Sequence, residues 1–440
     1  MVAYLSMAYF AQFYFSPGSR INGTDYSFKS PLYAEELEKE NPSEYKLEII
    51  FRDGKQVIKG SEIGLVYDYL SSLNDIKESQ NPFLWFSNFD GKDYKIGKTL
   101  SFKEDLLESR IEKFTQLNPD KMISPENPII EMNDEGIVVA TIKEAGTTIE
   151  DIDGLKTRIK EAISHEETSI NVEEEGFYKG PQFPVESYKV QQCLEYCNNI
   201  ANLKIYYIYG DVEIPFTRRQ LYDTIAISET YGAAISKNAT EAVLKRYSWL
   251  HDTYDKDRVF RTYKGKYINV HGEYYGWQIN LEEETDLLYS DLIHQRNVSR
   301  TPVFSYEGTV YTKEEDDIGD TYVEVDLENQ HVYLYLEGKM TMEADCVTGC
   351  VNRGNATPPG LYYIYYKQSP SLLTGGETPV WVDYWMPFNR GIGLHDASWR
   401  WKFGEDIYVS NGSHGCVNLP LDFARDLYFS VDAGTPVVVY

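Results

Sequence analysis

The sequence is poor in positive charge. It has 42 lysine and arginine residues against 69 aspartate and glutamate residues, which gives a formal net charge of −27 at pH 7. The phosphates of nucleic acids and the headgroups of an anionic membrane would repel such a chain. The charge therefore excludes nucleic acid as a partner and electrostatic docking to a membrane, although it leaves a membrane tether open.

Long hydrophobic runs are also missing, apart from one stretch at the start. Residues 1–19 carry no charge, and the first charged residue is Arg20. A membrane-spanning helix needs ~20 mostly apolar residues, whereas this stretch is interrupted by Gln12, Ser16 and Pro17 and lacks the basic region and cleavage site of a signal peptide. Two interpretations stay open: a helix packed on the first domain, or an anchor-proximal segment at the outer end of a transmembrane helix.

Cysteine is scarce, with five residues in 440, and four of them form two pairs at i, i+4 spacing. On a straight strand, Cys346 and Cys350 would lie about 13 Å apart, beyond the limit of about 7 Å for a disulfide, so a bond between them requires a turn. Cys193 and Cys197 fit one face of a helix, which favours buried thiols. Three apolar residues share that predicted face: Val190, Leu194 and Ala201. The spacing argues against a four-cysteine zinc site, and the disulfide state of both pairs stays open.

Apolar residues are nevertheless plentiful enough for folded cores. They make up 42% of the chain, and the length suggests two to four domains. Tyrosine is unusually common, with 37 residues against 19 phenylalanines and 7 tryptophans. Such amphipathic rings suit extended surfaces and grooves.

The first three hundred residues contain a weakly repeated pattern of strand, glycine turn and helix. The turns begin at Gly60, Gly146 and Gly276. The predicted strands and helices around them are, in order, 45–51 and 65–75, 136–142 and 151–163, and 266–272 and 281–293. Apolar residues recur at helical spacing in each predicted helix. We therefore predict α+β repeat modules, with one set at residues 20–185 and a further unit and linker at 186–310.

The character of the chain changes after Pro302. Residues 321–327 and 331–336 alternate strictly between apolar and polar positions, with a hairpin turn at 328–330. Further predicted strands lie at 340–348, 361–367, 380–388, 407–410 and 436–440, and residues 420–431 form the one predicted helix of this region. Residues 316–440 are thus predicted to form a mostly β domain, a sandwich or a barrel.

One cysteine in this β domain is surrounded by residues suited to nucleophilic catalysis. A free thiol is mostly protonated at neutral pH, so a cysteine nucleophile needs an imidazole that takes its proton. His414 precedes Cys416 by two residues, which on an extended strand would place both side chains on one face about 6.6 Å apart. His395 comes from a separate strand end, and Gly415 permits close approach of a substrate and offers a backbone N–H to an oxyanion.

These residues carry a resemblance to a known family. His395, followed after seventeen residues by Ser413-His-Gly-Cys-Val-Asn418, resembles the signature of the L,D-transpeptidase catalytic domain of the YkuD type. Val347-Thr-Gly349 and Thr357-Pro-Pro-Gly360 match further parts of that pattern, which covers about residues 318–440. Residues 14 to about 300 more loosely resemble the peptidoglycan-binding repeats that precede this domain in Gram-positive members.

The resemblance implies a cysteine acyltransferase that acts on peptidoglycan stem tetrapeptides without metal or organic cofactor. Cys416 would form a thioester with release of the terminal D-Ala, and a second stem would then complete a 3→3 cross-link. His395 matches the general base, oriented by the backbone carbonyl of Asp396, while His414 would support the thiolate and the substrate. Ser413, Gly415 and Asn418 would shape the turn and the oxyanion site.

The same resemblance implies sensitivity to carbapenem-type inhibitors and a place on the outer side of a bacterial cell surface, held by an N-terminal transmembrane helix. Two rival functions stay open: an L,D-carboxypeptidase that uses water as acceptor, and a non-catalytic wall-binding protein. The residues Tyr384, Trp385, Met386 and Trp399 lie near His395 in the sequence. They are either core residues of alternating strands or the wall of a groove for the stem peptide. The oligomeric state is left open.

Overall fold

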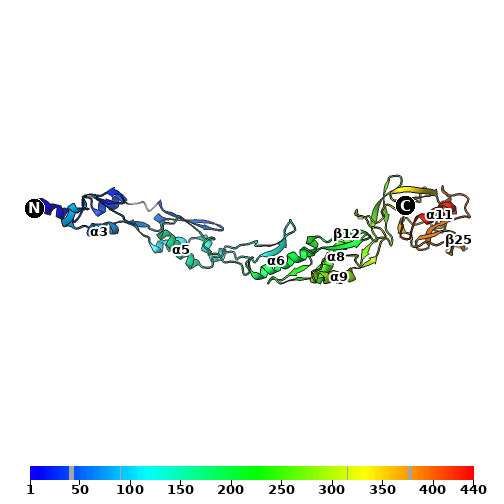
Figure 1. The fold of residues 1–440 in the computed structure, drawn as a ribbon, viewed down its shortest axis with the longest axis horizontal. Coiled ribbons are helices and arrows are strands. Elements are labelled where there is room, and N and C mark those ends of the chain that lie inside the picture. The colour runs from blue at the N-terminus through cyan, green and yellow to red at the C-terminus, as the bar shows by residue number, and fades with distance from the viewer. Residues whose placement is uncertain (39–43, 90, 315, 375–378) are drawn as a thin grey trace. The chain divides into compact units, whose positions relative to one another are not determined.

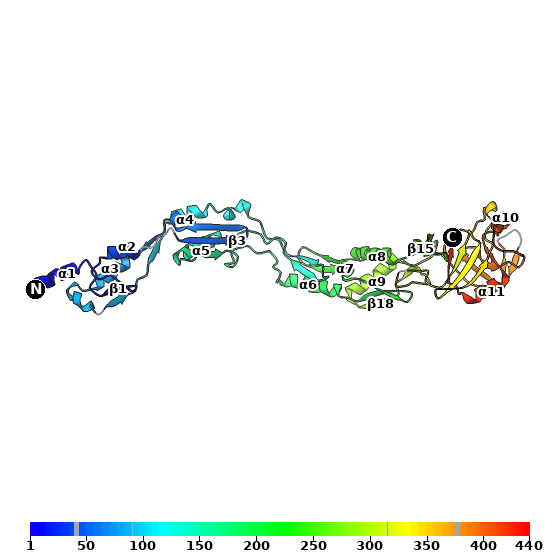
Figure 2. The ribbon, with the colours of Figure 1, turned by 90° about the horizontal axis from the view of Figure 1, so that it is seen from above.

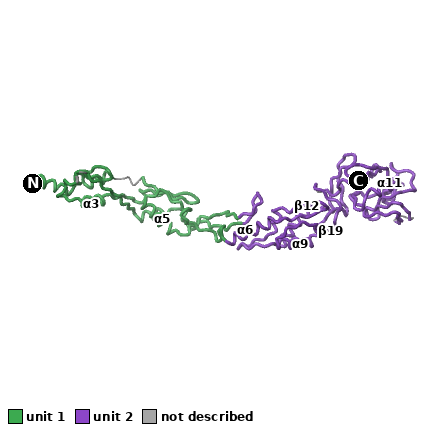
Figure 3. The backbone as a smooth tube through the Cα atoms, viewed as in Figure 1, with its two compact units in different colours: residues 1–129, 140–187 green, residues 130–139, 188–440 purple. Residues whose placement is uncertain are grey.

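The computed structural model describes residues 1–38, 44–89, 91–314, 316–374 and 379–440. The chain divides into two units (Figure 3). One comprises residues 1–129 and 140–187, and the other comprises residues 130–139 and 188–440. The antiparallel strands β8 (Ile129–Met132) and β9 (Val138–Thr141) lie where the chain passes between the units. Each unit is described by itself.

The first unit is built around a small sheet in the order β10-β3-β4. Its helices are α1 (Val2–Phe10), α2 (Pro31–Glu38), α3 (Leu70–Ser79), α4 (Glu104–Ile111) and α5 (Ile152–Ser164). Its strands are β1 (Ser19–Ile21), β2 (Thr24–Asp25), β3 (Lys46–Phe51), β4 (Gly54–Lys59), β5 (Val66–Asp68), β6 (Lys92–Tyr94), β7 (Thr99–Ser101) and β10 (Ser169–Asn171). Leu47, Ile49 and Phe51 alternate inward along β3, and α5 buries Leu155 and Ile159 on the same core.

The uncharged N-terminal stretch begins with helix α1, which contacts the rest of the first unit. The hydroxyl of Tyr4 donates a hydrogen bond to the carbonyl oxygen of Phe83 at 2.5 Å, and the rings of Phe10 and Tyr14 stack with their centroids 4.0 Å apart. Within the described parts of the chain, no helix is both long and apolar enough to cross a bilayer. The anchor remains a prediction.

The second unit begins with another α+β region. Its helices are α6 (Tyr188–Ala201), α7 (Arg218–Tyr222), α8 (Lys237–His251) and α9 (Leu281–Ile293). Its strands are β11 (Ile205–Tyr209), β12 (Val212–Pro215), β13 (Ile225–Ile227), β14 (Ala233–Ile235), β15 (Asp257–Arg261), β16 (Tyr267–His271), β17 (Gln278–Ile279), β18 (Val298–Arg300) and β19 (Phe304–Tyr306). Figures 1 and 2 both show α8 and α9 side by side.

The two α+β regions share one arrangement. In each, a hairpin is followed by a helix and by a strand that pairs in parallel with the first strand of the hairpin: β3, β4, α5 and β10 in one unit, and β11, β12, α9 and β18 in the other. This common order combines strand 45–51 and helix 151–163, which the sequence pattern assigned to two different units, so the predicted repeat modules stay a prediction. Wall binding by these regions stays a prediction.

The C-terminal region is a sandwich of open sheets. Its strands are β20 (Tyr322–Asp326), β21 (His331–Leu336), β22 (Lys339–Asp345), β23 (Gly360–Tyr363), β24 (Ser371–Leu373), β25 (Val380–Val382), β26 (Trp385–Asn389), β27 (Ile392–Asp396), β28 (Val417–Leu419) and β29 (Pro436–Val439). Its helices are α10 (Ile407–Asn411) and α11 (Leu421–Ser430). The sheet β22-β21-β20-β29-β23 has two free edges, so it is not a closed barrel. Its inner valines, such as Val325 and Val439, share a core with Leu394 of the sheet β26-β27-β28 and with Leu427 of α11.

Several predicted elements differ from the observed ones. Residues 407–410 were expected as a strand and form helix α10 instead, so 420–431 is not the one helix of this domain. The segment 65–75 is expected to form one helix. Its first part instead forms strand β5, which pairs with β7, and helix α3 begins only at Leu70. The expected strand at 380–388 is divided into β25 and β26.

The outer face of the five-stranded sheet packs against the β15–β16 hairpin of the same unit. The backbone N–H of Tyr263 donates to the buried carboxylate of Glu324 at 2.9 Å. Phe260 packs edge-on against Tyr322 with ring centroids 5.3 Å apart. The hairpin therefore covers the side of the sheet opposite the core.

Candidate active site

The sheet β26-β27-β28 places the predicted site residues next to one another. Trp385 of β26 pairs with His395 of β27, and His395 pairs in parallel with Asn418 of β28. Paired residues on neighbouring strands lie on the same face of a sheet, so these three side chains converge. Gly393 is required for this close pairing, because a Cβ there would lie 2.7 Å from the carbonyl oxygen of Met386.

The imidazole of His395 is held at both nitrogens. Its Nδ1–H donates to the backbone carbonyl oxygen of Asp396 at 2.7 Å, as the resemblance implied. A carbonyl oxygen can only accept, so in the neutral ring Nε2 carries the lone pair. The Nδ2 of Asn418 lies 3.0 Å from Nε2 and donates to it. Burial lowers the pKa of His395, and the ring is therefore neutral at pH 7.

Arg400 fixes the orientation of the Asn418 amide. Its Nε–H donates to Asn418 Oδ1 at 2.8 Å, and a guanidinium cannot accept, so the NH₂ group must face His395. A second bond, from Arg400 Nη1 to the carbonyl oxygen of Asn411 at 2.9 Å, secures the guanidinium. The sequence analysis gave Arg400 no role, because nothing in the motif marks it.

The thiol of Cys416 lies just before β28 and is partly buried. It donates to the carbonyl oxygen of Gly391 at 3.7 Å. Burial raises its pKa to about 11, while a hydrogen bond from the Gly393 backbone acts in the opposite direction. The resting site therefore combines a protonated thiol with a neutral imidazole.

The segment before Cys416 is a turn that is fixed by hydrogen bonds, rather than a strand. Gly415 has a φ of +128°, in a region that favours glycine, and β28 begins only at Val417. The expected same-face placement of His414 and Cys416 on one strand is therefore wrong, and His414 is exposed. Ser413 Oγ donates to the carbonyl oxygen of Cys416 at 2.5 Å and accepts the N–H of Gly415 at 3.0 Å. That N–H is thus engaged and does not point freely to an oxyanion.

The side chain of Thr357 also stabilises this turn through hydrogen bonds. Its hydroxyl donates to the carbonyl oxygen of Gly415 at 2.7 Å and accepts the backbone N–H of Gly349 at 2.9 Å. The sequence analysis placed Thr357 and Gly349 in two separate family-like turns without connecting them. The structure shows that one hydroxyl joins both turns to the segment that carries Cys416.

Of the four predicted substrate contacts, two touch His395. The ring of Trp385 lies 5.8 Å from the imidazole and the ring of Trp399 lies 6.0 Å from it, between centroids. Trp399 is 47% exposed, whereas Trp385 is buried. Met386 is fully buried in the core, and Tyr384 packs against the ring of Tyr428 at 5.3 Å.

The carboxylate of Asp396 supports the strand that carries Trp385. It is buried and accepts the backbone N–H groups of Asp383 and Tyr384, both at 2.8 Å. Asp396 therefore acts twice, since its carbonyl oxygen orients His395 and its side chain holds the start of β26.

The other cysteines are free thiols. Cys193 and Cys197 are buried on α6, as the helical spacing predicted, and Cys346 and Cys350 are buried beside the Gly349 turn. Among the residues that the structure describes, no group of three or more histidine, cysteine, aspartate or glutamate side chains could hold a metal ion.

The C-terminal part of the chain is similar to a family of known proteins. Residues 320–439 match the YkuD family, the L,D-transpeptidase catalytic domain. The chain is similar to a solved mutant L,D-transpeptidase of Enterococcus faecium, with 29% identity over 57% of this chain and 100% of that one, and a TM-score of 0.49. The catalytic domain of the E. faecium enzyme is 40% identical over 28% of this chain and 100% of that one, with a TM-score of 0.26. A structure of that domain acylated by ertapenem also matches, with 40% identity over 28% of this chain and 100% of that one, and a TM-score of 0.27. No curated protein matches the chain.

Proposed function

Because residues 320–439 of this chain belong to the L,D-transpeptidase catalytic-domain family, we propose that the protein forms 3→3 cross-links between peptidoglycan stem tetrapeptides through a thioester at Cys416. The observation that carries the proposal is the buried, neutral imidazole of His395. Its tautomer is set by the carbonyl of Asp396, and its strand is paired with the strand that follows Cys416.

The reaction divides into two acyl transfers. In the first, the sulfur of Cys416 attacks the carbonyl carbon of the third residue of the donor stem, and its proton passes to Nε2 of His395. The amide bond to the terminal D-Ala breaks, and the departing amine takes that proton. In the second, the amine of an acceptor stem attacks the thioester and gives its proton to Nε2, and the sulfur leaves and is protonated again.

The protonation states explain why a base is needed. A thiol with a pKa of about 11 is ionised in about one molecule in ten thousand at pH 7, so the free thiolate lies about 5 kcal/mol uphill. Proton transfer to His395 during attack avoids that state. In the resting structure, the lone pair of Nε2 accepts a hydrogen bond from the Asn418 amide. This hydrogen bond must break when substrate binds, so that Nε2 can accept the proton of the Cys416 thiol.

The surroundings of His395 suggest where substrate lies. The exposed face of Trp399 would contact the stem peptide, and Trp385 packs against the imidazole. Met386 lies fully buried in the core and would not contact substrate. Exposed His414 would contact substrate rather than the buried base. By likeness to the enterococcal domain that ertapenem acylates, carbapenems would acylate Cys416. A peptidoglycan substrate would require the enzyme to act at the outer side of a bacterial cell surface.

The test uses the full chain with disaccharide tetrapeptides and mass spectrometry of the products. We expect a cross-linked dimer that has lost one D-Ala. Cys416→Ala should abolish both the dimer and the ertapenem adduct, whereas the matched control Cys193→Ala, at a buried thiol of helix α6, should retain both. Release of D-Ala without dimer would identify a carboxypeptidase, and an unchanged adduct on Cys416→Ala would overturn the assignment of the nucleophile.

A further inference from the structure

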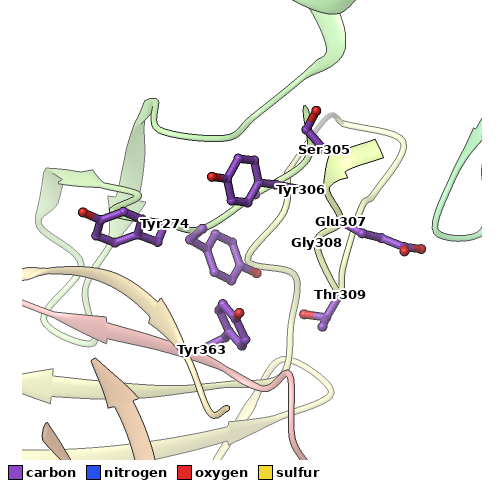
Figure 4. Close-up of a pocket in the computed structure, with 9 residues that line it drawn as sticks. Tyr274, Ser305, Tyr306, Glu307, Gly308, Thr309 and Tyr363 are labelled. Atoms are coloured by element: carbon purple, nitrogen blue, oxygen red, sulfur yellow. The ribbon is translucent and has the colours of Figure 1, made fainter. Parts of the chain in front are cut away.

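A concave site lies within the second unit, where its α+β region meets the C-terminal domain. It is a pocket of about 200 Å³. Residues 274–276 and 305–309 of the α+β region line it, together with Tyr363 of β23. Figure 4 shows the rings of Tyr274, Tyr306 and Tyr363 gathered around the pocket, while the carboxylate of Glu307 points away from them.

The lining is aromatic and rich in hydroxyl groups. Tyr274 is 56% exposed and Tyr306 is 47% exposed, so their rings are accessible from solvent. Tyr306 is a rigid platform, because the ring of Tyr254 stacks behind it with centroids 3.9 Å apart and planes inclined by 16°. Tyr363 is backed by Tyr275, whose ring centroid lies 5.9 Å away.

This chemistry selects a class of ligand. Aromatic faces present apolar area, and the tyrosine hydroxyls at their edges both donate and accept hydrogen bonds. Ser305 adds a further hydroxyl group to the lining, whereas the hydroxyl of Thr309 donates to the carbonyl oxygen of Gly434 at 2.7 Å. A pyranose ring has the complementary surface, with an apolar C–H face and hydroxyl groups around its edge. The lining contains the acidic residue Glu307 and no lysine or arginine, and Arg390 reaches it only through the hydroxyl of Tyr274. A neutral sugar therefore suits the pocket better than a phosphate or a carboxylate.

The pocket is linked to the active site through one short turn. Arg390 and Gly391 join β26 to β27. Arg390 Nη2 donates to the hydroxyl of Tyr274 at 3.4 Å, and the next residue, Gly391, accepts the hydrogen bond of the Cys416 thiol at 3.7 Å. A ligand against Tyr274 therefore lies beside the same turn that contacts the nucleophile.

We propose that this pocket binds a sugar ring of the glycan strand whose stem peptide occupies the site at Cys416. The proposal rests on the proposed function and adds a glycan subsite to it. The α+β region then takes part in substrate selection, because it supplies Tyr274 and Tyr306 to a site completed by Tyr363 of the C-terminal domain.

The test compares two donor substrates on the full chain: a disaccharide tetrapeptide and the same tetrapeptide without sugars. For Tyr306→Ala we expect KM to rise roughly two- to tenfold with the disaccharide substrate, the loss typical of one aromatic contact, with kcat nearly unchanged. With the sugar-free substrate, KM should stay at the parent value. Tyr306→Phe, which keeps the ring, should show a smaller rise.

The matched control is Tyr267→Ala, a tyrosine of β16 that is 67% exposed and does not line the pocket. It should leave KM unchanged with both substrates. An equal rise with both substrates, or no rise with either, would overturn the glycan subsite. If the parent enzyme turns over neither substrate, the proposed function fails, and saturation-transfer NMR with the peptide-free disaccharide then decides the pocket alone: the signal should be present in the parent and lost in Tyr306→Ala, and a parent without signal would refute it.

Discussion

Replacing Asn418 by aspartate would put a carboxylate oxygen where an amide N–H now faces Nε2 of His395. The present contact is a donated hydrogen bond of 3.0 Å. Arg400 would remain 2.8 Å from the other oxygen and would keep the new carboxylate ionised. Such a carboxylate can only accept, so it favours a proton on Nε2. Because Nδ1–H already donates to Asp396, the favoured state becomes the doubly protonated imidazolium.

The size of the effect follows from the new contact. A hydrogen bond to a charged partner contributes about 1.5–3 kcal/mol, and one pKa unit corresponds to about 1.4 kcal/mol. The pKa of His395, now lowered by burial, should therefore rise by about 1–2 units. A protonated imidazole cannot act as a base. Because the parent pKa lies below 6.5, a rise of 1–2 units should lower the acylation rate at pH 7 by at most about 3- to 25-fold, and the rate should recover as the pH is raised.

The assay is the rate of ertapenem adduct formation, followed by mass spectrometry between pH 5 and 9. For the parent, the rate should fall as pH decreases through a pKa below the ordinary value of 6.5, since only the neutral ring accepts the thiol proton. Asn418→Asp should move this acid limb upward, whereas Asn418→Ala, which removes the donor without adding charge, should move it by much less. An acid limb that stays in place in Asn418→Asp would refute the assignment of Nε2 as the base.

Three further outcomes follow from other contacts. Because only the thiolate reacts with iodoacetamide and the pKa of Cys416 is about 11, alkylation should accelerate about tenfold per pH unit between pH 7 and 10, and a plateau below pH 8 would contradict the raised pKa. Thr357→Val removes the two hydrogen bonds that Thr357 makes to Gly349 and Gly415, and it should lower the free energy of unfolding in urea by about 1–3 kcal/mol. An unchanged midpoint would show that these hydrogen bonds do not stabilise the fold. Asp317→Asn replaces the buried charged partner of Arg258, whose side chain is 11% exposed, and should cost about 3–5 kcal/mol in the same experiment, with a loss below 1 kcal/mol as the contrary result.

Local pattern was enough to predict the elements whose burial follows their own periodicity. Strict alternation marked β20 and β21, and helical spacing marked α5 and α9. Pattern failed at Ile407-Tyr-Val-Ser410, whose β-branched residues favour a strand. There the Cys350 thiol donates to the carbonyl oxygen of Val409, and Arg400 donates to that of Asn411. Contacts from residues distant in sequence thus stabilise α10 against its local preference.

The residues of the candidate site likewise fall into two groups, those that the local sequence pattern predicts and those that it does not. The motif predicted Cys416, His395 and the Asp396 carbonyl, because fixed spacing within one segment carries the chemistry. Arg400 and Thr357 were not predicted, since their partners lie 18 and 58 residues away and become neighbours only in the folded sheet. The alternation of residues along a strand did not predict which aromatic side chains near His395 are exposed, because β26 is buried along its whole length.

The neutral resting pair has a consequence for selectivity. Burial disfavours charge on both groups, raising the pKa of the Cys416 thiol and lowering that of the His395 imidazole, so an ion pair is the costly state. A thiol in this state reacts slowly with reagents that merely collide with it. In the reaction that we propose, it would react when a bound carbonyl develops negative charge and the proton moves to Nε2 in the same step. At neutral pH the site should therefore discriminate by how well an electrophile is positioned rather than by its intrinsic reactivity. Contacts that position a substrate, such as those proposed for Trp399 and for the pocket beside Tyr274, would then bear on the reactivity of Cys416 itself.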